Sequence, residues 1–208
     1  MMKKINRVLR EILYRVYERN EPFMSQKSLA QACETSMDTV NRLVSKLHQF
    51  GSIEKKPLGF RVTDPKKVLL YWASTRNLAR DLVYSTYSPD SVSEIEAEMP
   101  PGTIFTCYSG YQRRFKDAPT YYEEVHVYAD PDLVKRRFPE KDVERKNIFV
   151  LRPDPHLKKV SKNNAAPLAQ IYVDLWQIGE ATGDRFILEL EKKLEFKPIE
   201  ALKALTQK

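Results

Sequence analysis

Residues 36–50, SMDTVNRLVSKLHQF, predict an amphipathic helix with a polar and cationic outer face. Ser36 is a suitable N-cap, because its hydroxyl can accept a hydrogen bond from an amide of the first turn. Four apolar residues recur at helical spacing and predict one buried stripe, namely Val40, Leu43, Val44 and Leu47. Gly51 follows as a stop signal. Such a helix suits the major groove of DNA, and it suits an ordinary surface position equally well.

Two further helices are expected before this stretch. Apolar residues repeat at helical spacing from Ile5 to Tyr17 and predict a first helix with a basic outer face. Ser25 can cap a short second helix over residues 26–34, and a brief turn at residues 34–35 follows it. Two helices separated by a few residues, of which the second carries a polar face, form a helix-turn-helix arrangement.

A β-hairpin is expected directly after the third helix. Two extended runs, residues 52–55 and 60–63, flank a turn that holds proline and glycine. A small hairpin in this position is a wing. Three cations lie where a wing would follow the phosphates of a duplex: Lys55, Lys56 and Arg61.

The region from Ile5 to Thr63 resembles a winged helix-turn-helix domain of the transcription-regulator type. The matching features are the cap at residues 36–39, the Thr39-Val40-x-Arg42 run, and Leu47 through Gly51-x-Ile53. The resemblance implies a domain that binds double-stranded DNA. Winged helices also serve as protein-docking modules, so a pure protein-interaction module stays open as an alternative.

The positive charge of the chain is concentrated in its first third. The whole chain has a formal net charge of +7, and residues 1–75 hold 14 Lys and Arg against 7 Asp and Glu. Residues 76–208 hold 21 residues of each sign. This asymmetry indicates a polyanion as the partner of the first region only, against the alternative of a lopsided solvated surface.

Composition excludes several other classes of protein. With 208 residues, 42% hydrophobic and 30% charged, the chain is typical of a globular protein rather than a disordered one. Its two cysteines and three histidines are widely spaced, so we expect no disulfide framework, no zinc site and no cofactor. The basic start, residues 1–16, has no uninterrupted apolar run. We therefore expect neither a signal peptide nor a membrane span, and a cytoplasmic location.

Beyond Asp64 the pattern changes from helices alone to strands that alternate with helices. Connecting helices are expected up to residue 87, with a break near Ser74. Strands are then expected within residues 103–111, 120–130 and 147–155, and helices within residues 91–99, 111–115, 131–139, 167–179 and 183–196. A basic loop is expected at Lys158–Lys162, and a short terminal helix from Pro198. The alternation predicts an α/β (α+β) chain with a small mixed sheet. We predict two domains, residues 1–75 and 76–208, with residues 76–90 as a connecting helix.

The order of strand, Ser-Gly turn, helix and acidic strand resembles the minimal nucleotidyltransferase fold, whose active members hold two metal ions. Here the turn reads Tyr108-Ser109-Gly110, the reverse of the family's Gly-Ser order. The strand offers Glu124 where the family has two carboxylates, and Asp130 lies too far along to replace the second. We therefore expect that the protein is not an enzyme and that it has no metal site. The alternative is a divergent nucleotidyltransferase that its winged helix targets to nucleic acid, with Glu124 and Asp174 as metal carboxylates.

A more particular resemblance is to the AbiEi-type antitoxin family, which joins an N-terminal winged helix to a degenerate nucleotidyltransferase-like domain. Residues 105–110, 124–128 and 149–151 match its strands, and residues 167–176 match a helix with an Asp-Leu pair at Asp174-Leu175. The resemblance implies a DNA-binding repressor that controls its own operon beside a toxin. The toxin would then be a protein partner of the C-terminal domain.

The function predicted from the sequence is that of a sequence-specific transcriptional regulator of double-stranded DNA. Thr39, Asn41 and Arg42 are expected to approach base edges, since Asn suits adenine and Arg suits guanine. Many such regulators read two half-sites, which favours a homodimer. The remaining residues of the predicted DNA surface, including the phosphate-binding cations, are Ser36, Ser45, Lys46, Lys55, Lys56 and Arg61.

Overall fold

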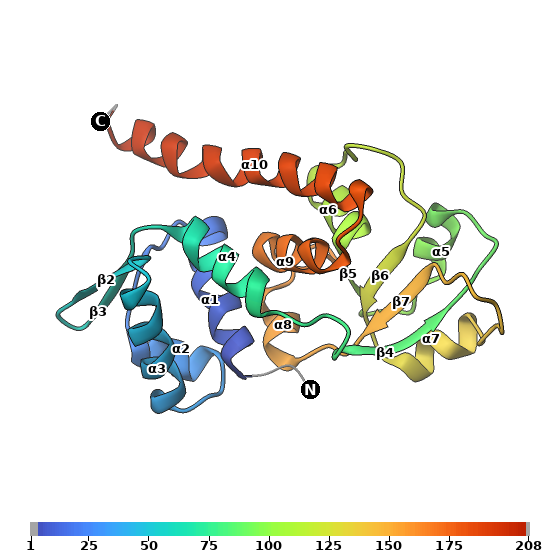
Figure 1. Ribbon diagram of the computed structural model, residues 1–208, viewed down its shortest axis with the longest axis horizontal. Helices are drawn as coiled ribbons and strands as arrows, with labels where there is room; N and C mark the ends of the chain where they lie inside the picture. Colours follow the sequence, from blue (N-terminus) through green and yellow to red (C-terminus); the bar gives the residue numbers. More distant parts are fainter. Residues whose placement is uncertain (1–3, 207–208) are drawn as a thin grey trace.

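The computed structural model describes residues 4–206, with side chains up to Leu194, and it confirms a mixed α+β chain (Figure 1). The elements of the first part are α1 (Lys4–Arg19), β1 (Phe23–Met24), α2 (Gln26–Ala32), α3 (Met37–Gln49), β2 (Ile53–Lys56), β3 (Gly59–Val62) and α4 (Pro65–Thr75). Those of the second part are β4 (Leu82–Thr86), α5 (Val92–Glu98), β5 (Ile104–Thr106), α6 (Cys107–Phe115), β6 (Val125–Tyr128), α7 (Pro131–Arg137), β7 (Ile148–Leu151), α8 (Pro155–Val160), α9 (Leu168–Ile178) and α10 (Ala181–Thr206).

The helices α1, α2 and α3 pack together beside the smaller sheet, as the apolar periodicity predicts. Ser25 and Ser36 cap α2 and α3, and each serine oxygen accepts a hydrogen bond from the backbone N–H three residues on, at 3.1 and 3.2 Å. The predicted stripe of α3 is buried throughout. Gly51, at φ +65°, adopts the left-handed conformation that ends the helix at little cost for glycine.

The predicted hairpin is confirmed, and its two strands lie one residue closer to the turn than expected. β2 and β3 pair antiparallel, with Glu54 opposite Arg61. The sequence gives no sign of β1, because a strand of two residues is too short to show alternation. β1 pairs with the other edge of β3 and places Phe23 opposite Arg61, so the sheet order is β1-β3-β2. β3 is therefore hydrogen-bonded along both of its edges, to β2 within the hairpin and to β1 outside it.

Gly59 is required by this close strand pairing. A Cβ added at Gly59 would lie 2.5 Å from the backbone oxygen of Met24 in β1. We expect Gly59→Ala to lower the free energy of unfolding by about 1–3 kcal/mol, because the backbone must move to relieve the overlap. Gly183→Ala is the matched control, since its added Cβ meets neighbours only at 3.6 Å. Urea unfolding followed by circular dichroism measures both, and equal stabilities would contradict the prediction.

The larger sheet has the strand order β4-β7-β6-β5. β6 and β7 are parallel, whereas β4–β7 and β5–β6 are antiparallel, which confirms the expected mixed sheet. Helices cover both faces (Figure 1). α5 and α7 cover one face, where Ile95 and Val134 join the core of Phe105, Val127 and Val150. α6, α9 and α10 lie on the other face.

The helix expected over residues 76–90 is wrong, because Leu82–Thr86 forms β4. The four-residue spacing of Leu78 and Leu82 suggested a helix. The local pattern is overridden by pairing with β7, where Thr86 lies opposite Ile148. The predicted break near Ser74 is confirmed, since α4 ends at Thr75.

Three further local expectations are corrected. Ser109 and Gly110 lie inside α6 rather than in a turn. Gly110 permits the close approach of α6 to β5, because a Cβ there would lie 2.9 Å from the backbone oxygen of Phe105. The expected basic loop is mostly helix α8, which carries Lys158 and Lys159. α10 continues through Pro198 instead of giving way to a separate helix.

One hydrophobic core continues from the first part of the chain into the second. α1 and α4 both pack against α9, and α1 also contacts α8 (Figure 1). Val8, Ile12, Trp72 and Ile171 are fully buried in this core. The predicted division at residue 75 therefore falls between two parts that share buried surface.

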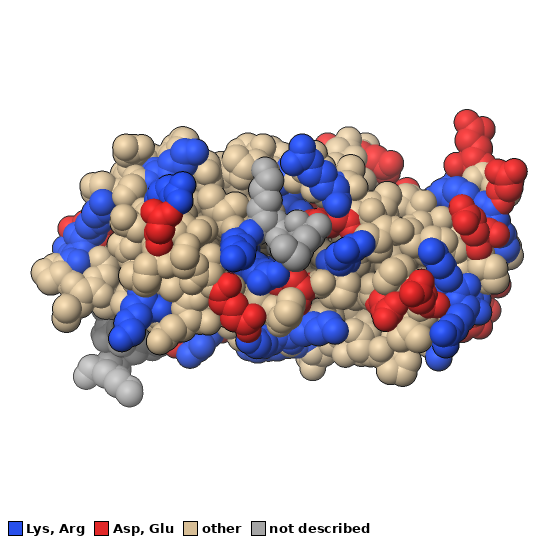
Figure 2. Space-filling model, turned by 90° about the horizontal axis from the view of Figure 1, so that it is seen from below, with Lys and Arg blue, Asp and Glu red and all other residues tan. Residues whose placement is uncertain are grey.

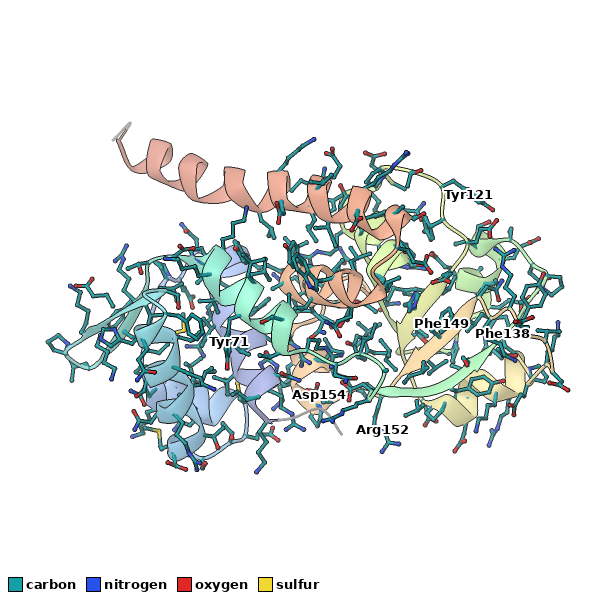
Figure 3. The ribbon with its side chains drawn as sticks, viewed as in Figure 1. Tyr71, Tyr121, Phe138, Phe149, Arg152 and Asp154 are labelled. Atoms are coloured by element: carbon teal, nitrogen blue, oxygen red, sulfur yellow. The ribbon has the colours of Figure 1, made fainter. Side chains whose placement is uncertain are left out.

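The sequence predicts a basic outer face for α1, and this prediction is wrong for half of the arginines of the helix. Arg7 and Arg10 are buried, and Arg10 is 0% exposed. Arg10 donates to both oxygens of Asp154, at 3.1 and 2.8 Å, and its Nε donates to Gln170 on α9 at 2.8 Å. Asp154 lies just before α8 (Figure 3). Burial raises the pKa of Asp154, but the charge and hydrogen bonds of Arg10 outweigh it and hold that pKa below its ordinary value.

Candidate nucleic-acid interface

The outward face of α3 is polar and unobstructed. Asn41, Arg42 and Lys46 are exposed, and Ser45 is half-buried. Ser36 is occupied at the start of the helix, where its hydroxyl caps Thr39 and lies 2.9 Å from the Thr39 hydroxyl. The expected base-reading residues Asn41 and Arg42 therefore lie one turn inside a well-capped helix end.

The hairpin is fixed rigidly to the end of α3. The Ser52 hydroxyl donates to the backbone oxygen of Leu47 at 2.8 Å. The backbone oxygen of Ser52 accepts hydrogen bonds from the N–H groups of Thr63 and Asp64. An imidazole nitrogen of His48 lies 3.2 Å from the Ile53 oxygen. These contacts tie both ends of the hairpin to the last turn of α3, so the hairpin backbone lies beside the helix.

The hairpin carries exposed positive side chains. Lys55, Lys56 and Arg61 are all exposed on the hairpin. Figure 2 shows Lys and Arg side chains over the whole of this face, with acidic side chains beside them both at the left end, where Figure 1 places the hairpin, and at the right end. The three exposed cations of the hairpin fit a surface that follows a phosphate backbone.

One cation of α3 and one cation of the hairpin form ion pairs with neighbouring acidic side chains. Arg42 forms an ion pair with Asp38 on the preceding turn of α3, and both side chains are exposed. Lys56 lies 2.6 Å from Glu54 on the same strand. Exposed pairs of this kind contribute little to stability and exchange readily with a stronger anion, so both cations are available to phosphate or a base edge.

Leu58 is a surface residue that the sequence interpretation missed. It occupies the tip of the hairpin at φ +69° and is 92% exposed. The available signal was an apolar residue inside a Pro-Leu-Gly turn. Leu58 therefore gives the hairpin an apolar, exposed tip.

Asp174, the second carboxylate of the enzyme alternative, lies at the centre of a buried hydrogen-bond network. It is 0% exposed. One of its oxygens accepts from Arg76 at 3.3 Å and Gln170 at 2.8 Å, and the other accepts from Thr106 at 2.8 Å and Tyr128 at 2.7 Å. Four donors leave no lone pair for a metal ion, so Asp174 holds α9 to the sheet instead.

Gln170 joins this network to the Arg10–Asp154 contact. Its oxygen accepts from Arg10, and its nitrogen donates to Tyr128 at 3.0 Å as well as to Asp174. A continuous chain of buried polar contacts thus runs from α1 to the larger sheet. Because each member is satisfied by a neighbour, the chain fixes the orientation of α1, and through it the position of α3.

The remaining expectations about sites concern metals, thiols and membranes. Within the described residues no group of three or more His, Cys, Asp and Glu side chains is arranged to hold a metal ion. Cys33 and Cys107 are free and buried, and burial raises the pKa of the Cys33 thiol to about 12. Among the helices of the described chain, none combines the length and apolar character that a membrane crossing requires.

Comparisons with known proteins give no relative. No protein-family model, no curated protein and no solved structure matches the chain.

Proposed function

We propose that this protein is a transcriptional regulator that binds double-stranded DNA through α3 and the β2–β3 hairpin. In this proposal residues 5–63 form a winged helix-turn-helix, with α2 and α3 as the helix pair and the hairpin as the wing. Thr39, Asn41 and Arg42 face base edges in the major groove, and Lys55, Lys56 and Arg61 face phosphates.

The observation that carries the proposal is the joint position of α3 and the hairpin. An exposed polar helix face, Asn41 to Lys46, lies beside a hairpin that carries exposed cations and whose two ends are joined to α3 by the hydrogen bonds of Ser52. A recognition helix supplies specific contacts, and a wing alongside it supplies sequence-independent affinity. A helix on the surface for packing reasons alone has no need of this neighbouring basic hairpin.

The second part of the chain supports a regulatory role within the same proposal. Its mixed sheet, covered by α5 and α7 on one face and by α6 and α9 on the other, fits a degenerate nucleotidyltransferase-like domain. The engagement of Asp174 by four donors favours a role in binding rather than in phosphoryl transfer. The proposal is accordingly a repressor of the AbiEi antitoxin type, with a toxin as the partner of the second part.

The salt dependence of duplex binding tests the proposal. Fluorescence anisotropy with a labelled duplex, measured across a series of KCl concentrations, gives the slope of log K against log salt. We expect a Lys55→Ala/Lys56→Ala double variant to reduce that slope by roughly 0.9 for each lysine, because each phosphate contact releases counterions.

A matched double variant controls for the loss of charge itself. Lys158 and Lys192 are exposed lysines of the second part, far from the hairpin in the sequence. We expect Lys158→Ala/Lys192→Ala to keep the slope of the unmodified protein. Equal slopes in the hairpin variant and the unmodified protein would place the hairpin off the DNA, and absence of any duplex binding at low salt would refute the function.

A further inference from the structure

Helix α8 of the second part of the chain holds a buried histidine against α1 of the first part. Figure 1 shows α8 between α1 and the larger sheet, and the two helices are in contact. His156, the second residue of α8, is only 3% exposed. Its Nε2 atom lies 2.8 Å from a carboxylate oxygen of Glu11, and its Nδ1 atom lies 3.2 Å from Nη1 of Arg10. Two consecutive residues of α1 therefore engage both nitrogens of the ring.

These two contacts determine which ring nitrogen carries the proton. The guanidinium of Arg10 has only N–H donors, so Nδ1 of His156 has to accept from it with a lone pair. Burial raises the pKa of Glu11, but the hydrogen bonds from His156 and Arg15 outweigh it and hold that pKa below its ordinary value. Glu11 is therefore a carboxylate, which accepts, so Nε2 has to carry the hydrogen. Only the neutral imidazole with its proton on Nε2 satisfies both neighbours.

The charges around His156 oppose a second proton on its ring. Three arginines and two carboxylates, all at least partly buried, form ion pairs beside it, namely Arg7, Arg10 and Arg15 with Glu11 and Asp154. Three cations against two anions leave one positive charge in excess before the imidazole is counted. A proton on Nδ1 of His156 would add a second, and it would point one N–H group at another N–H group of Arg10.

The other groups that face this site keep their charge near neutral pH. Both carboxylates of the site have lowered pKa values. In α2, burial raises the pKa of the Cys33 thiol to about 12. After α2, the hydrogen bond from Lys159 holds the pKa of Glu34 below its ordinary value, and in α9 Gln170 is uncharged. Among the described residues around this site, His156 is thus the group that can change its charge between about pH 5 and about pH 8.

We propose that His156 is a pH-sensitive contact between the two parts of the chain. The neutral ring joins α8 to α1 through both of its nitrogens. Protonation of Nδ1 replaces the hydrogen bond from Arg10 by repulsion between two donors and two positive charges, so acid loosens the contact. A contact that requires the unprotonated ring is favoured as the pH rises and weakened as the pH falls.

The change at His156 is expected to reach α2. The other oxygen of Glu11 accepts from Nε of Arg15 at 2.6 Å, and Nη1 of Arg15 donates to the Ser28 hydroxyl in α2 at 2.9 Å. Loss of the His156 contact at acid pH therefore disturbs a carboxylate that also positions the arginine between α1 and α2.

Nitrogen-15 NMR of the histidine rings in the unmodified full-length protein tests the protonation state directly. At about pH 7.5 we expect His156 to show a pyrrole-like Nε2 and a pyridine-like Nδ1. The chain has three histidines, and the signals that disappear in His156→Gln give the assignment. A proton on Nδ1, either in the other neutral tautomer or in an imidazolium ion, would overturn the proposal.

Hydrogen exchange at about pH 8 and about pH 5 measures the strength of the contact. The amides of Lys158 and Ser161 report on α8, because both donate to backbone oxygens within it or at its start. We expect their protection, corrected for the intrinsic exchange rate, to fall at least about tenfold at the lower pH. Uptake of one proton on opening shifts the opening equilibrium by up to about tenfold per pH unit.

His156→Gln should remove this pH dependence. The amide of glutamine can donate to Glu11 and accept from Arg10, and it does not titrate. We expect the protection of the α8 amides in His156→Gln to change less than about twofold between the two pH values. Equal losses of protection in His156→Gln and in the unmodified protein, or no loss in the unmodified protein, would overturn the proposal.

His48→Gln is the matched control, because it removes an exposed imidazole from α3. We expect its α8 amides to lose protection as in the unmodified protein, and a pH dependence abolished by His48→Gln would overturn the assignment to His156. Glu124 also titrates in this range, since burial raises its pKa to about 7, but all three proteins retain it. Both measurements are made without DNA, so they do not depend on the proposed function.

Discussion

Arg10→Met is expected to lower the free energy of unfolding by about 3–5 kcal/mol. The Arg10 side chain is fully buried and donates to both oxygens of Asp154. Its removal leaves the buried Asp154 carboxylate with only Arg7, whose Nε lies 3.6 Å away, as a counter-charge, and leaves the Gln170 oxygen without its donor. Chemical denaturation followed by circular dichroism gives the difference in unfolding free energy between the variant and the unmodified protein.

Arg19→Met is the matched control at the other end of α1. Arg19 is exposed, and its ion pair with Glu21 is 2.8 Å long. We expect its loss to change the unfolding free energy by no more than about 1 kcal/mol. Similar effects of the two substitutions would show that the Arg10 contact contributes no more than a surface pair.

A double variant distinguishes two causes of the lower stability of Arg10→Met: the lost attraction between Arg10 and Asp154, and the burial of the Asp154 carboxylate without Arg10. Arg10→Met/Asp154→Leu removes both charges, so we expect it to be more stable than Arg10→Met alone. The recovery should be partial, because Asp154 also caps α8 by accepting from the N–H of Leu157 at 3.0 Å. If the double variant is less stable than Arg10→Met, the buried charge of Asp154 is not the cause of the destabilisation.

Arg42→Ala is expected to weaken binding to a preferred duplex by about 1–3 kcal/mol, if Arg42 reads a base as proposed. The preferred duplex is obtained by selection from a random library with the unmodified protein. Anisotropy titrations of that duplex and of a scrambled duplex then give the specificity ratio. We expect the ratio to fall in Arg42→Ala, because a base contact is lost while the hairpin contacts to phosphates remain.

Asp38→Asn is a control for which we expect the opposite change in duplex affinity. Asp38 holds Arg42 in an exposed ion pair and places a negative charge on the proposed DNA surface. We expect Asp38→Asn to strengthen duplex binding several-fold, because it frees Arg42 and removes repulsion from phosphates. Unchanged affinity in both Arg42→Ala and Asp38→Asn would remove this end of α3 from the interface.

The N-terminal helices could be predicted from the sequence because their signals are local. Ser25 and Ser36 cap the helices they precede, and the apolar stripe of α3 has helical periodicity over its whole length. β1 could not be predicted, since Phe23-Met24 is a strand only through its pairing with β3. The local pattern of β4 predicts a helix for a related reason, because its partner β7 lies more than sixty residues later in the chain.

The buried arginines of α1 were the main error about the surface. In the sequence, Arg7 and Arg10 are indistinguishable from solvated residues of a basic helix. Their burial depends on Asp154, which is 144 residues away from Arg10. Charge in the first third of the chain therefore overstates the cations available to a duplex, because part of it binds the second part of the protein. The exposed cations of α3 and the hairpin remain as predicted.

Amide NMR spectra recorded during titration with the selected duplex test the position of the DNA surface most directly. We expect the largest chemical-shift changes in α3 from Met37 to Lys46 and in the hairpin from Ile53 to Val62. Residues around Tyr108 and Glu124 should change little when only duplex is added. Shifts confined to the second part of the chain, or no shifts at duplex concentrations that saturate anisotropy, would contradict DNA binding through α3 and the hairpin.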